Sequence, residues 1–481
     1  MATAGCDDPN PTQTKTPLST STPAVALIQG QSFPLDVPIV DDHLPFSSTV
    51  PSLMEIGSKS RYVNAAPQDA KCSVIQIQMV ARHGTRNPTA GNLKTMTAFQ
   101  SALTAKNVTN PKFSFLSNFT LPCSPAQAGL LSGQGRQDHV QLGQYVASRY
   151  ATLISDPSRI DWQATNVSRA LSSGQSFISG LLTGDAGFMA VRSMFNAVVP
   201  RPLDSDLRPF DSCSTYLKDS TAQKNQTNQP DDTFIAAKYP AIARRIAEMI
   251  GVDSLAATQV QTMFDLCSFD NTLQGAQNRF CSVFTEADLQ LADFSSDLNF
   301  NAMNGYGLAI NDKLGCSLLT NLDKNIAAMI SNPDTAPKAT FKFAHAETIA
   351  PLIVGLGLFR NNTPLSPNMT ADEIQSRTFR SARFSPFAAN VMLELLDCGS
   401  SEKAVRVLVG EVAQLVPGCP DVVCPLSAFR MALSGKLNCD FDGAVCSNSI
   451  PTVGGAARFP NTATIPIGNI IAALNADADN K

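Results

Sequence analysis

In three short stretches of the chain, hydrophobic residues either alternate with polar ones or follow one another without a break. Each stretch ends in polar residues just before a helical pattern. They are residues 74–81, 160–165 and 339–343, where β-branched and aromatic residues predict strands. Helical periodicity follows each of them, over residues 95–106, residues 170–182 and from Ile349 onward. Repeated strand-to-helix units are typical of α/β proteins, in which ligands bind at the carboxyl ends of the strands. The polar residues at these three ends are therefore candidate site residues.

The hydrophobic pattern changes between residues 200 and 335, where helical patterns are broken by polar loops. Alternation typical of a strand returns at residues 405–409. We predict an α/β fold with a large α/β domain, whose central, mostly parallel sheet is flanked by helices, and a smaller, mainly helical inserted domain. The expected ranges are 36–200 and 336–481 for the α/β domain, 201–335 for the helical domain and 1–35 for an extended arm rich in Pro, Thr and Ser.

The first strand leads directly into the stretch Arg82-His83-Gly84-Thr85-Arg86-Asn87-Pro88. Two guanidinium groups flank one imidazole there, and guanidinium forks match the oxygens of a phosphate group. Nearby positive charges disfavour the imidazolium, so His83 is expected to stay neutral and able to attack phosphorus. The alternative is a surface turn whose arginines pair with carboxylates. The strand before the stretch and the helix after it favour a phosphate site.

Composition and cysteines narrow the class of protein. The 481 residues are 43% hydrophobic and 16% charged, with a net charge of −4, which argues against nucleic-acid and acidic-membrane partners. No apolar span is long enough to cross a bilayer. Twelve cysteines without a Cys-x-x-Cys pair, beside four histidines, make zinc unexpected and favour a disulfide-bonded, secreted protein from which a signal peptide has been removed. The alternative is an intracellular protein with buried thiols.

The stretch that begins at Arg82 resembles the Arg-His-Gly-x-Arg-x-Pro signature of the histidine acid phosphatases. The third strand ends in His345-Ala346-Glu347-Thr348, whereas most of that superfamily carries His-Asp at this point. His-Ala-Glu-Thr resembles the multiple inositol polyphosphate phosphatase branch. Weaker similarities, among them residues 207–213, 305–311 and 383–390, extend the resemblance over roughly residues 57–446.

The resemblance implies a phosphomonoesterase that works through a phosphohistidine, without a metal or another cofactor. It implies that His83 is the nucleophile and Glu347 the proton donor. The groups that hold the phosphoryl oxygens would be Arg82, Arg86, Arg169 and His345. The implied substrate is inositol hexakisphosphate, with lower inositol phosphates as products. Further substrate contacts are expected at Thr85, Lys94, Lys59 and Arg61. A solvated basic loop is an equally good interpretation of Lys59 and Arg61, and an exposed surface lysine is the better interpretation of Lys94.

The resemblance also implies disulfides. The expected pairs are Cys72 with Cys398, Cys267 with Cys281, Cys419 with Cys424, and Cys213 with either Cys439 or Cys446. Cys6, Cys123 and Cys316 are left without a partner, because sequence alone does not give connectivity.

Other functions remain open at this stage. A broad acid phosphatase would not need Lys59, Arg61 and Lys94. A transferase of the phosphoglycerate mutase type would also use an Arg-His-Gly motif, but it would not need twelve cysteines. A secreted binding protein of the same fold would commonly lack the nucleophile or the acid, and both are present here. We expect a monomer.

Overall fold

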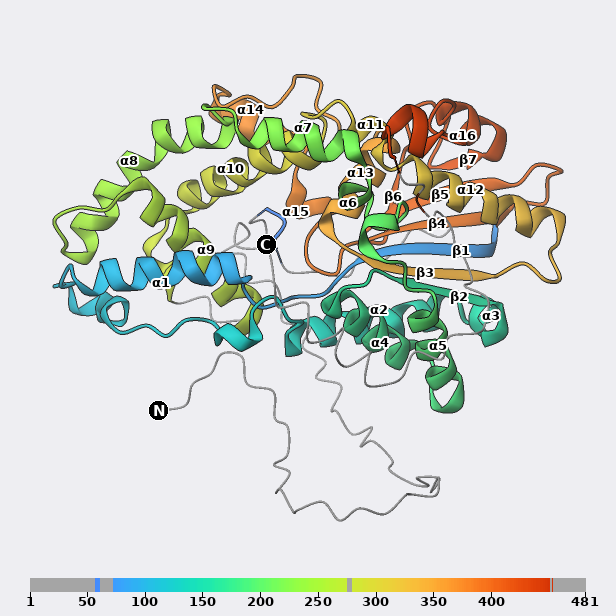
Figure 1. The fold of residues 1–481 in the computed structure, drawn as a ribbon, viewed down its shortest axis with the longest axis horizontal. Helices are drawn as coiled ribbons and strands as arrows, with labels where there is room; N and C mark the ends of the chain where they lie inside the picture. The colour runs from blue at the N-terminus through green and yellow to red at the C-terminus, as the bar shows by residue number, and fades with distance from the viewer. Residues whose placement is uncertain (1–56, 61–71, 275–278, 450–451, 453–481) are drawn as a thin grey trace, which may run out of the picture.

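The computed structural model describes residues 57–60, 72–274, 279–449 and 452, and it contains a seven-stranded sheet with helices packed around it (Figure 1). The strands follow the order β2-β3-β1-β4-β5-β6, with β7 paired to β5. Their bounds are β1 (Ser73–Arg82), β2 (Ile160–Ala164), β3 (Ala339–Ala344), β4 (Asn390–Asp397), β5 (Ala404–Val409), β6 (Val412–Gln414) and β7 (Val423–Pro425). The α/β fold and the three predicted strands β1, β2 and β3 are confirmed. The predicted N-terminal arm lies outside the described residues.

The sheet is mixed, which corrects the expectation that it is mostly parallel. Strands β2, β3 and β1 run parallel, whereas β4, β5, β6 and β7 pair antiparallel with their neighbours. Short connections explain two of the antiparallel pairings, β4 with β5 and β5 with β6. Gly410 and Glu411, both with positive φ, join β5 to β6 in a tight hairpin, and a short turn at Gly399 joins β4 to β5. Connections this short allow only antiparallel pairing.

Helices cover both faces of the sheet and make three layers (Figure 1). One face packs against α2 (Gly133–Arg149), α3 (Ala151–Ile154), α4 (Ser168–Leu181) and α5 (Gly184–Asn196). The other packs against α12 (Cys316–Ser331), α13 (Ala346–Gly355) and α16 (Leu426–Ala432). Trp162, Phe341 and Phe343 fill the first interface, while Val391, Leu393 and Val407 fill the second. Alternate residues of the strands therefore serve two cores.

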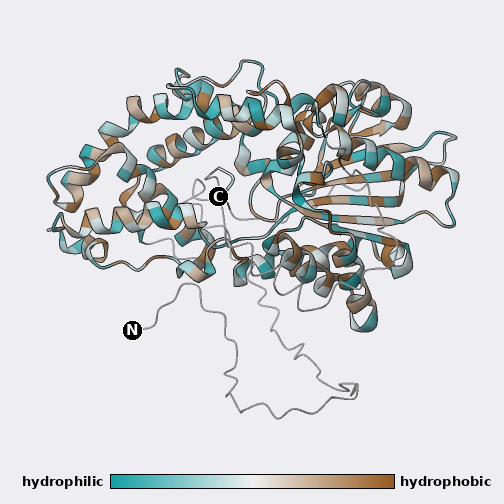
Figure 2. Ribbon diagram, in the orientation of Figure 1, coloured by the Kyte–Doolittle hydropathy of each residue, from teal (hydrophilic) through white to brown (hydrophobic). Residues whose placement is uncertain are grey.

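A second body, mainly helical, lies beside the sheet. Its core joins α1 (Ala90–Thr104) and η2 (Pro111–Ser117) to α8 (Pro230–Ile250), α9 (Ala257–Gln274), η6 (Phe280–Val283) and α10 (Glu286–Asn304). Hydrophobic and hydrophilic residues alternate along these helices, as expected for elements with one buried face (Figure 2). Phe99, Phe264 and Phe294 are among the buried residues that hold them together. The described part of residues 201–335 contains helices and no strand.

Shorter helices connect these elements. They are η3 (Pro125–Gln127), η4 (Pro157–Arg159), η5 (Arg201–Leu203), α6 (Pro209–Ser212), α7 (Ser214–Lys224), α11 (Asn311–Leu314), α14 (Ala371–Ser376), α15 (Ser381–Phe384) and η7 (Phe441–Val445). Across the described ranges, no helix has both the length and the apolar character needed to span a bilayer.

Five disulfides link the described cysteines. The expected pairs Cys72–Cys398, Cys267–Cys281 and Cys419–Cys424 are present, and Cys213 is bonded to Cys446. A further bond joins Cys316 to Cys439, which the sequence did not indicate. Cys123 is buried and not disulfide-bonded, and Cys6 lies outside the described residues.

Candidate active site

The predicted site residues gather where the three parallel strands end. Residues 82–86 leave β1, His345 follows β3, and Arg169 is the second residue of α4, just after β2. Because β2, β3 and β1 are parallel neighbours, their carboxyl ends meet at one edge of the sheet. The rings of His83 and His345 have centroids 5.6 Å apart, and the His83 amide donates to the Ala344 carbonyl at 2.9 Å.

Helices α2 and α4 hold the loop after β1. Asp138 on α2 accepts both from the Thr85 amide at 3.1 Å and from the Thr85 hydroxyl at 2.8 Å. His139 Nε2 donates to the Arg82 carbonyl at 3.0 Å, and the Gly84 amide donates to Ser173 Oγ on α4 at 3.0 Å. The loop is therefore fixed by buried hydrogen bonds before any ligand binds.

His83 is held as a neutral imidazole. Its Nδ1 lies 2.9 Å from the Gly84 carbonyl, which can only accept, so Nδ1 carries the proton and Nε2 keeps its lone pair. Burial lowers the pKa of His83 well below its usual value, and the charges of Arg169, Arg82 and Arg86 lower it further. A side chain that is 3% exposed thus retains an unprotonated nitrogen at mildly acidic pH.

Three arginines surround this histidine. Arg82 is 4% exposed, and its guanidinium lies over the Phe387 ring, with Cζ 4.4 Å from the centroid. Burial, together with the charge of Arg86, lowers the pKa of Arg82 to about 9. Burial and the charge of Arg169 lower the pKa of Arg86 to about 10, and burial likewise lowers the pKa of Arg169 to about 10. Positive charge is concentrated here, and an anion would relieve the repulsion.

Some arginine donors have no protein acceptor. Within the described residues, the buried Nε atoms of Arg82 and Arg169 make no hydrogen bond. Buried donors of a charged group cost free energy when they stay unpaired, so these atoms are suited to ligand oxygens.

Glu347 lies in the first turn of α13 and is exposed. Its carboxylate is close enough to raise the pKa of Arg82, Arg86 and Arg169, in opposition to the larger effect of burial. An exposed carboxyl group beside a cationic phosphate site is placed to exchange protons with both ligand and solvent.

Arg208 belongs to the site, although the sequence did not identify it as a site residue. Its Nη1 lies 2.7 Å from His345 Nε2, and its Nε donates to Asp211 at 2.7 Å. Because Arg208 can only donate, His345 Nε2 must be unprotonated. Burial and the charge of Arg208 hold the pKa of His345 well below its usual value. The one signal in the sequence was the similarity of residues 207–213 to the phosphatase branch.

The four expected substrate contacts differ in their positions. Thr85 is fully buried, and its hydroxyl is used by Asp138. Lys59 forms an ion pair with Asp265 of α9, while Lys94 is exposed on α1. Arg61 lies outside the described residues. Among the described residues, no group of three or more His, Cys, Asp and Glu side chains could hold a metal ion.

A neutral histidine among arginines, at the strand ends of a helix-flanked sheet, defines a class of phosphate-handling enzymes. Comparison with known families agrees with this geometry. The family model described as the histidine phosphatase superfamily (branch 2) matches residues 73–410. The chain therefore belongs to this superfamily, and it is a phosphatase.

Similar proteins lie within the same group. The chain is 25% identical over 422 residues to multiple inositol polyphosphate phosphatase 1 of Dictyostelium discoideum, covering 75% of this chain and 66% of that protein. It is 26% identical over 452 residues to multiple inositol polyphosphate phosphatase 1 of Gallus gallus, covering 83% and 93%. Among solved structures, the phytase from D. castellii superposes with a TM-score of 0.68 at 18% identity, covering 84% of this chain and 88% of that one.

Proposed function

We propose that this phosphatase hydrolyses inositol hexakisphosphate and lower inositol polyphosphates through a phosphohistidine on His83. The observation that carries the proposal is the neutral His83 imidazole surrounded by Arg82, Arg86 and Arg169. The names of the Dictyostelium and chicken relatives, and of the phytase that shares the fold, support the substrate class.

In the first step, His83 Nε2 attacks the phosphorus of a phosphomonoester. The bond from phosphorus to the inositol oxygen breaks, and a phosphohistidine forms. Arg82, Arg86, Arg169 and His345 hold the equatorial oxygens, on which charge is spread in the transition state. Nδ1 remains protonated on the Gly84 carbonyl, which orients the ring for attack.

The leaving inositol alkoxide is strongly basic, so it must receive a proton as it departs. Glu347 supplies that proton, and in the second step the resulting carboxylate takes a proton from the water that cleaves the phosphohistidine. The products are inorganic phosphate, the inositol alcohol and regenerated enzyme. Atoms and charges balance in both steps without a further reactant.

Peripheral contacts complete the proposal. Lys94 and Arg61 would meet phosphate groups that are not being cleaved, and Lys59 would do so if it left Asp265. Thr85 would act through its amide and hydroxyl contacts with Asp138. We propose an extracellular monomer, in accord with the five disulfides, and domain boundaries near residues 200 and 335.

A second candidate is a broad acid phosphatase. The ion pair of Lys59 with Asp265 favours it, because a lysine already neutralised by protein contributes less to binding a polyanion. The two candidates share the chemistry at His83 and differ in the substrate that is preferred.

The decisive test is phosphate release from inositol hexakisphosphate and from p-nitrophenyl phosphate at mildly acidic pH, for wild type and His83→Ala. We expect release from both substrates, a preference in kcat/KM for the inositol ester, and loss of both activities in the variant. Release from the aryl ester alone would select the broad phosphatase. A fully active His83→Ala enzyme would refute the mechanism.

A further inference from the structure

Arg82 is oriented by two backbone carbonyls from segments that lie far apart in the sequence. Its Nη1 donates to the carbonyl of Ser58 and, at 2.5 Å, to the carbonyl of Ser385. Both acceptors engage one corner of the guanidinium, while Nε is left without a partner among the described residues. Fixing Nη1 in this way leaves the edge formed by Nε and Nη2 as the fork that can bind two phosphate oxygens.

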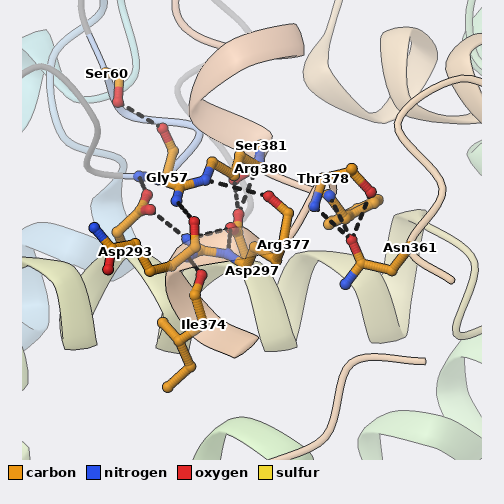
Figure 3. Close-up of polar contacts among 12 residues, drawn as sticks. Gly57, Ser60, Asp293, Asp297, Asn361, Ile374, Arg377, Thr378, Arg380 and Ser381 are labelled. Carbon is orange, nitrogen blue, oxygen red and sulfur yellow. Dashed lines mark hydrogen bonds and ion pairs between the residues drawn. The ribbon is translucent and has the colours of Figure 1, made fainter. Parts of the chain in front are cut away.

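The segment that carries Ser58 is anchored to α10. The Gly57 amide donates to Asp293 Oδ1 at 2.8 Å, and the Gly57 carbonyl accepts from the Ser60 amide and hydroxyl (Figure 3). The Ser60 carbonyl in turn accepts from the Phe387 amide at 3.1 Å, and the Phe387 ring lies against Arg82.

The segment that carries Ser385 is anchored to the same helix. Asp297, one turn after Asp293 on α10, accepts from the Ser381 amide at 2.8 Å and from its hydroxyl at 2.6 Å (Figure 3). Ser381 begins α15, and its carbonyl accepts from the Ser385 amide at 2.8 Å. Each acceptor of Arg82 thus leads back to one α10 carboxylate.

Arg377 joins the two carboxylates. Its Nε donates to Asp297 at 2.9 Å, and its Nη2 contacts both Asp297, at 2.8 Å, and Asp293. All three side chains are almost completely buried. A buried, fully hydrogen-bonded ionic cluster has one good geometry, so it fixes the relative positions of the groups bonded to it.

We propose that Asp293, Asp297 and Arg377 are positioning residues for the phosphate-binding fork of Arg82. They lie in α10 and before α15, and the hydrogen bonds described above join them to Gly57, to Ser381 and to one another. Their effect on the reaction passes through the Ser58 and Ser385 carbonyls. The inference rests on the proposed role of Arg82 but not on the inositol substrate, so p-nitrophenyl phosphate is a sufficient probe.

The test is a double-mutant cycle in kcat/KM between Asp293→Asn and Arg82→Ala. We expect Arg82→Ala to lower kcat/KM by at least about 100-fold, as for loss of a charge-stabilising donor. Asp293→Asn should lower it about 10-fold in the wild-type background, since a small misplacement of a binding group is costly. In the Arg82→Ala background the same change should cost less than about 2-fold, because residues that act through one another are not additive.

Two further variants keep the test decisive. Gly57→Ala changes no charge, but the new Cβ would overlap Ser296 Oγ, and the residue has a φ of +53°. Gly57→Ala should lower kcat/KM in the wild-type background and have little effect in the Arg82→Ala background. It replaces Asp293→Asn in the cycle if that variant does not fold. Asp288→Asn changes another carboxylate of α10, which pairs with Arg245 and caps the helix through Thr285, and it should leave kcat/KM near wild type.

Each failure has a distinct meaning. A fully active Arg82→Ala enzyme refutes the proposed role of Arg82 and the inference with it. An impaired Arg82→Ala beside wild-type activity in the folded Asp293 and Gly57 variants refutes the inference alone. Equal losses in both backgrounds also refute it, because they make the cluster a general stabiliser of the fold.

Discussion

In the proposed mechanism Glu347 and His83 have different roles, and substrates with different leaving groups can distinguish them. An alkoxide needs a proton on departure, whereas p-nitrophenolate leaves readily without one. We predict that Glu347→Gln lowers kcat/KM about 100-fold for an inositol phosphate but less than about 10-fold for p-nitrophenyl phosphate. Glu286→Gln, an exposed glutamate in the first turn of α10, is the matched control. Equal losses on both substrates would remove the proton-donor role.

Arg208 should control the protonation of His345. Removing its charge raises the pKa of His345 toward the usual value, so the imidazolium forms at higher pH. We predict that Arg208→Gln moves the acid limb of the kcat/KM profile upward by about one pH unit. Arg192→Gln, at an exposed position of α5, should leave the profile unchanged. If kcat/KM fell at every pH while the acid limb stayed at the same pH, Arg208 would act only on the fold.

Candidate site residues that belong to a local sequence motif were predictable from the sequence. Residues whose role depends on contacts with distant parts of the chain were not. Arg82, His83 and Arg86 form one compact stretch after a strand. Arg208 meets His345 across 137 residues, and Asp293 meets Gly57 across 236. No periodicity encodes contacts of that range, because they depend on how the elements pack.

At the scale of elements, the approach of α2 to the loop after β1 depends on two glycines. A Cβ on Gly135 would overlap the Thr85 carbonyl, and one on Gly84 would overlap the Gly135 carbonyl. We predict that Gly135→Ala shifts the loop and lowers kcat/KM about 100-fold while the protein stays folded. Gly187→Ala on α5, where no neighbour is closer than 3.3 Å, should be neutral. Normal activity in Gly135→Ala would show that α2 does not set the loop.

The sequence did not predict β4, β6 and β7, of which β4 is the longest. β1 begins with alternating residues, which is the strand signature. β4 is buried along nearly its whole length and reads as a continuous apolar run, interrupted by Glu394, which pairs with Arg406 of β5. Such a run cannot be told from a buried helix by period. Missing β4 led to the wrong expectation of a mostly parallel sheet, because β4 begins its antiparallel half.

At the scale of the whole molecule, Asp204 makes stability depend on pH. It is completely buried, and burial raises its pKa from 3.8 to about 7. The folded state therefore keeps a proton that the unfolded state has lost, so this contribution is full below pH 3.8 and is lost as pH rises through about 7.

We predict that Asp204→Asn, which keeps an acceptor for the Leu207 amide, removes that dependence. Its Tm relative to wild type should rise steadily as pH increases from acid to about 7 and then level off. Thermal unfolding across this range is the measurement. A difference in Tm that is constant with pH would show that Asp204 is charged in the folded protein throughout.

The sequence also did not predict which helices pack against the sheet and which belong to the mainly helical body. Helix α1 follows the loop after β1 directly, yet its buried face belongs to the core of α8, α9 and α10. Amphipathicity indicates that α1 has a buried face but does not say against which partner.

The two carbonyls that hold Arg82 come from residues 58 and 385, and its amide donates to the Ala389 carbonyl. During synthesis, the first of these is made early and the other two only after most of the chain has left the ribosome. A partly made chain therefore has the histidine and the arginines but no oriented phosphate fork. We therefore expect a chain that ends before Ser385 to be inactive, although it already carries His83 and Arg82.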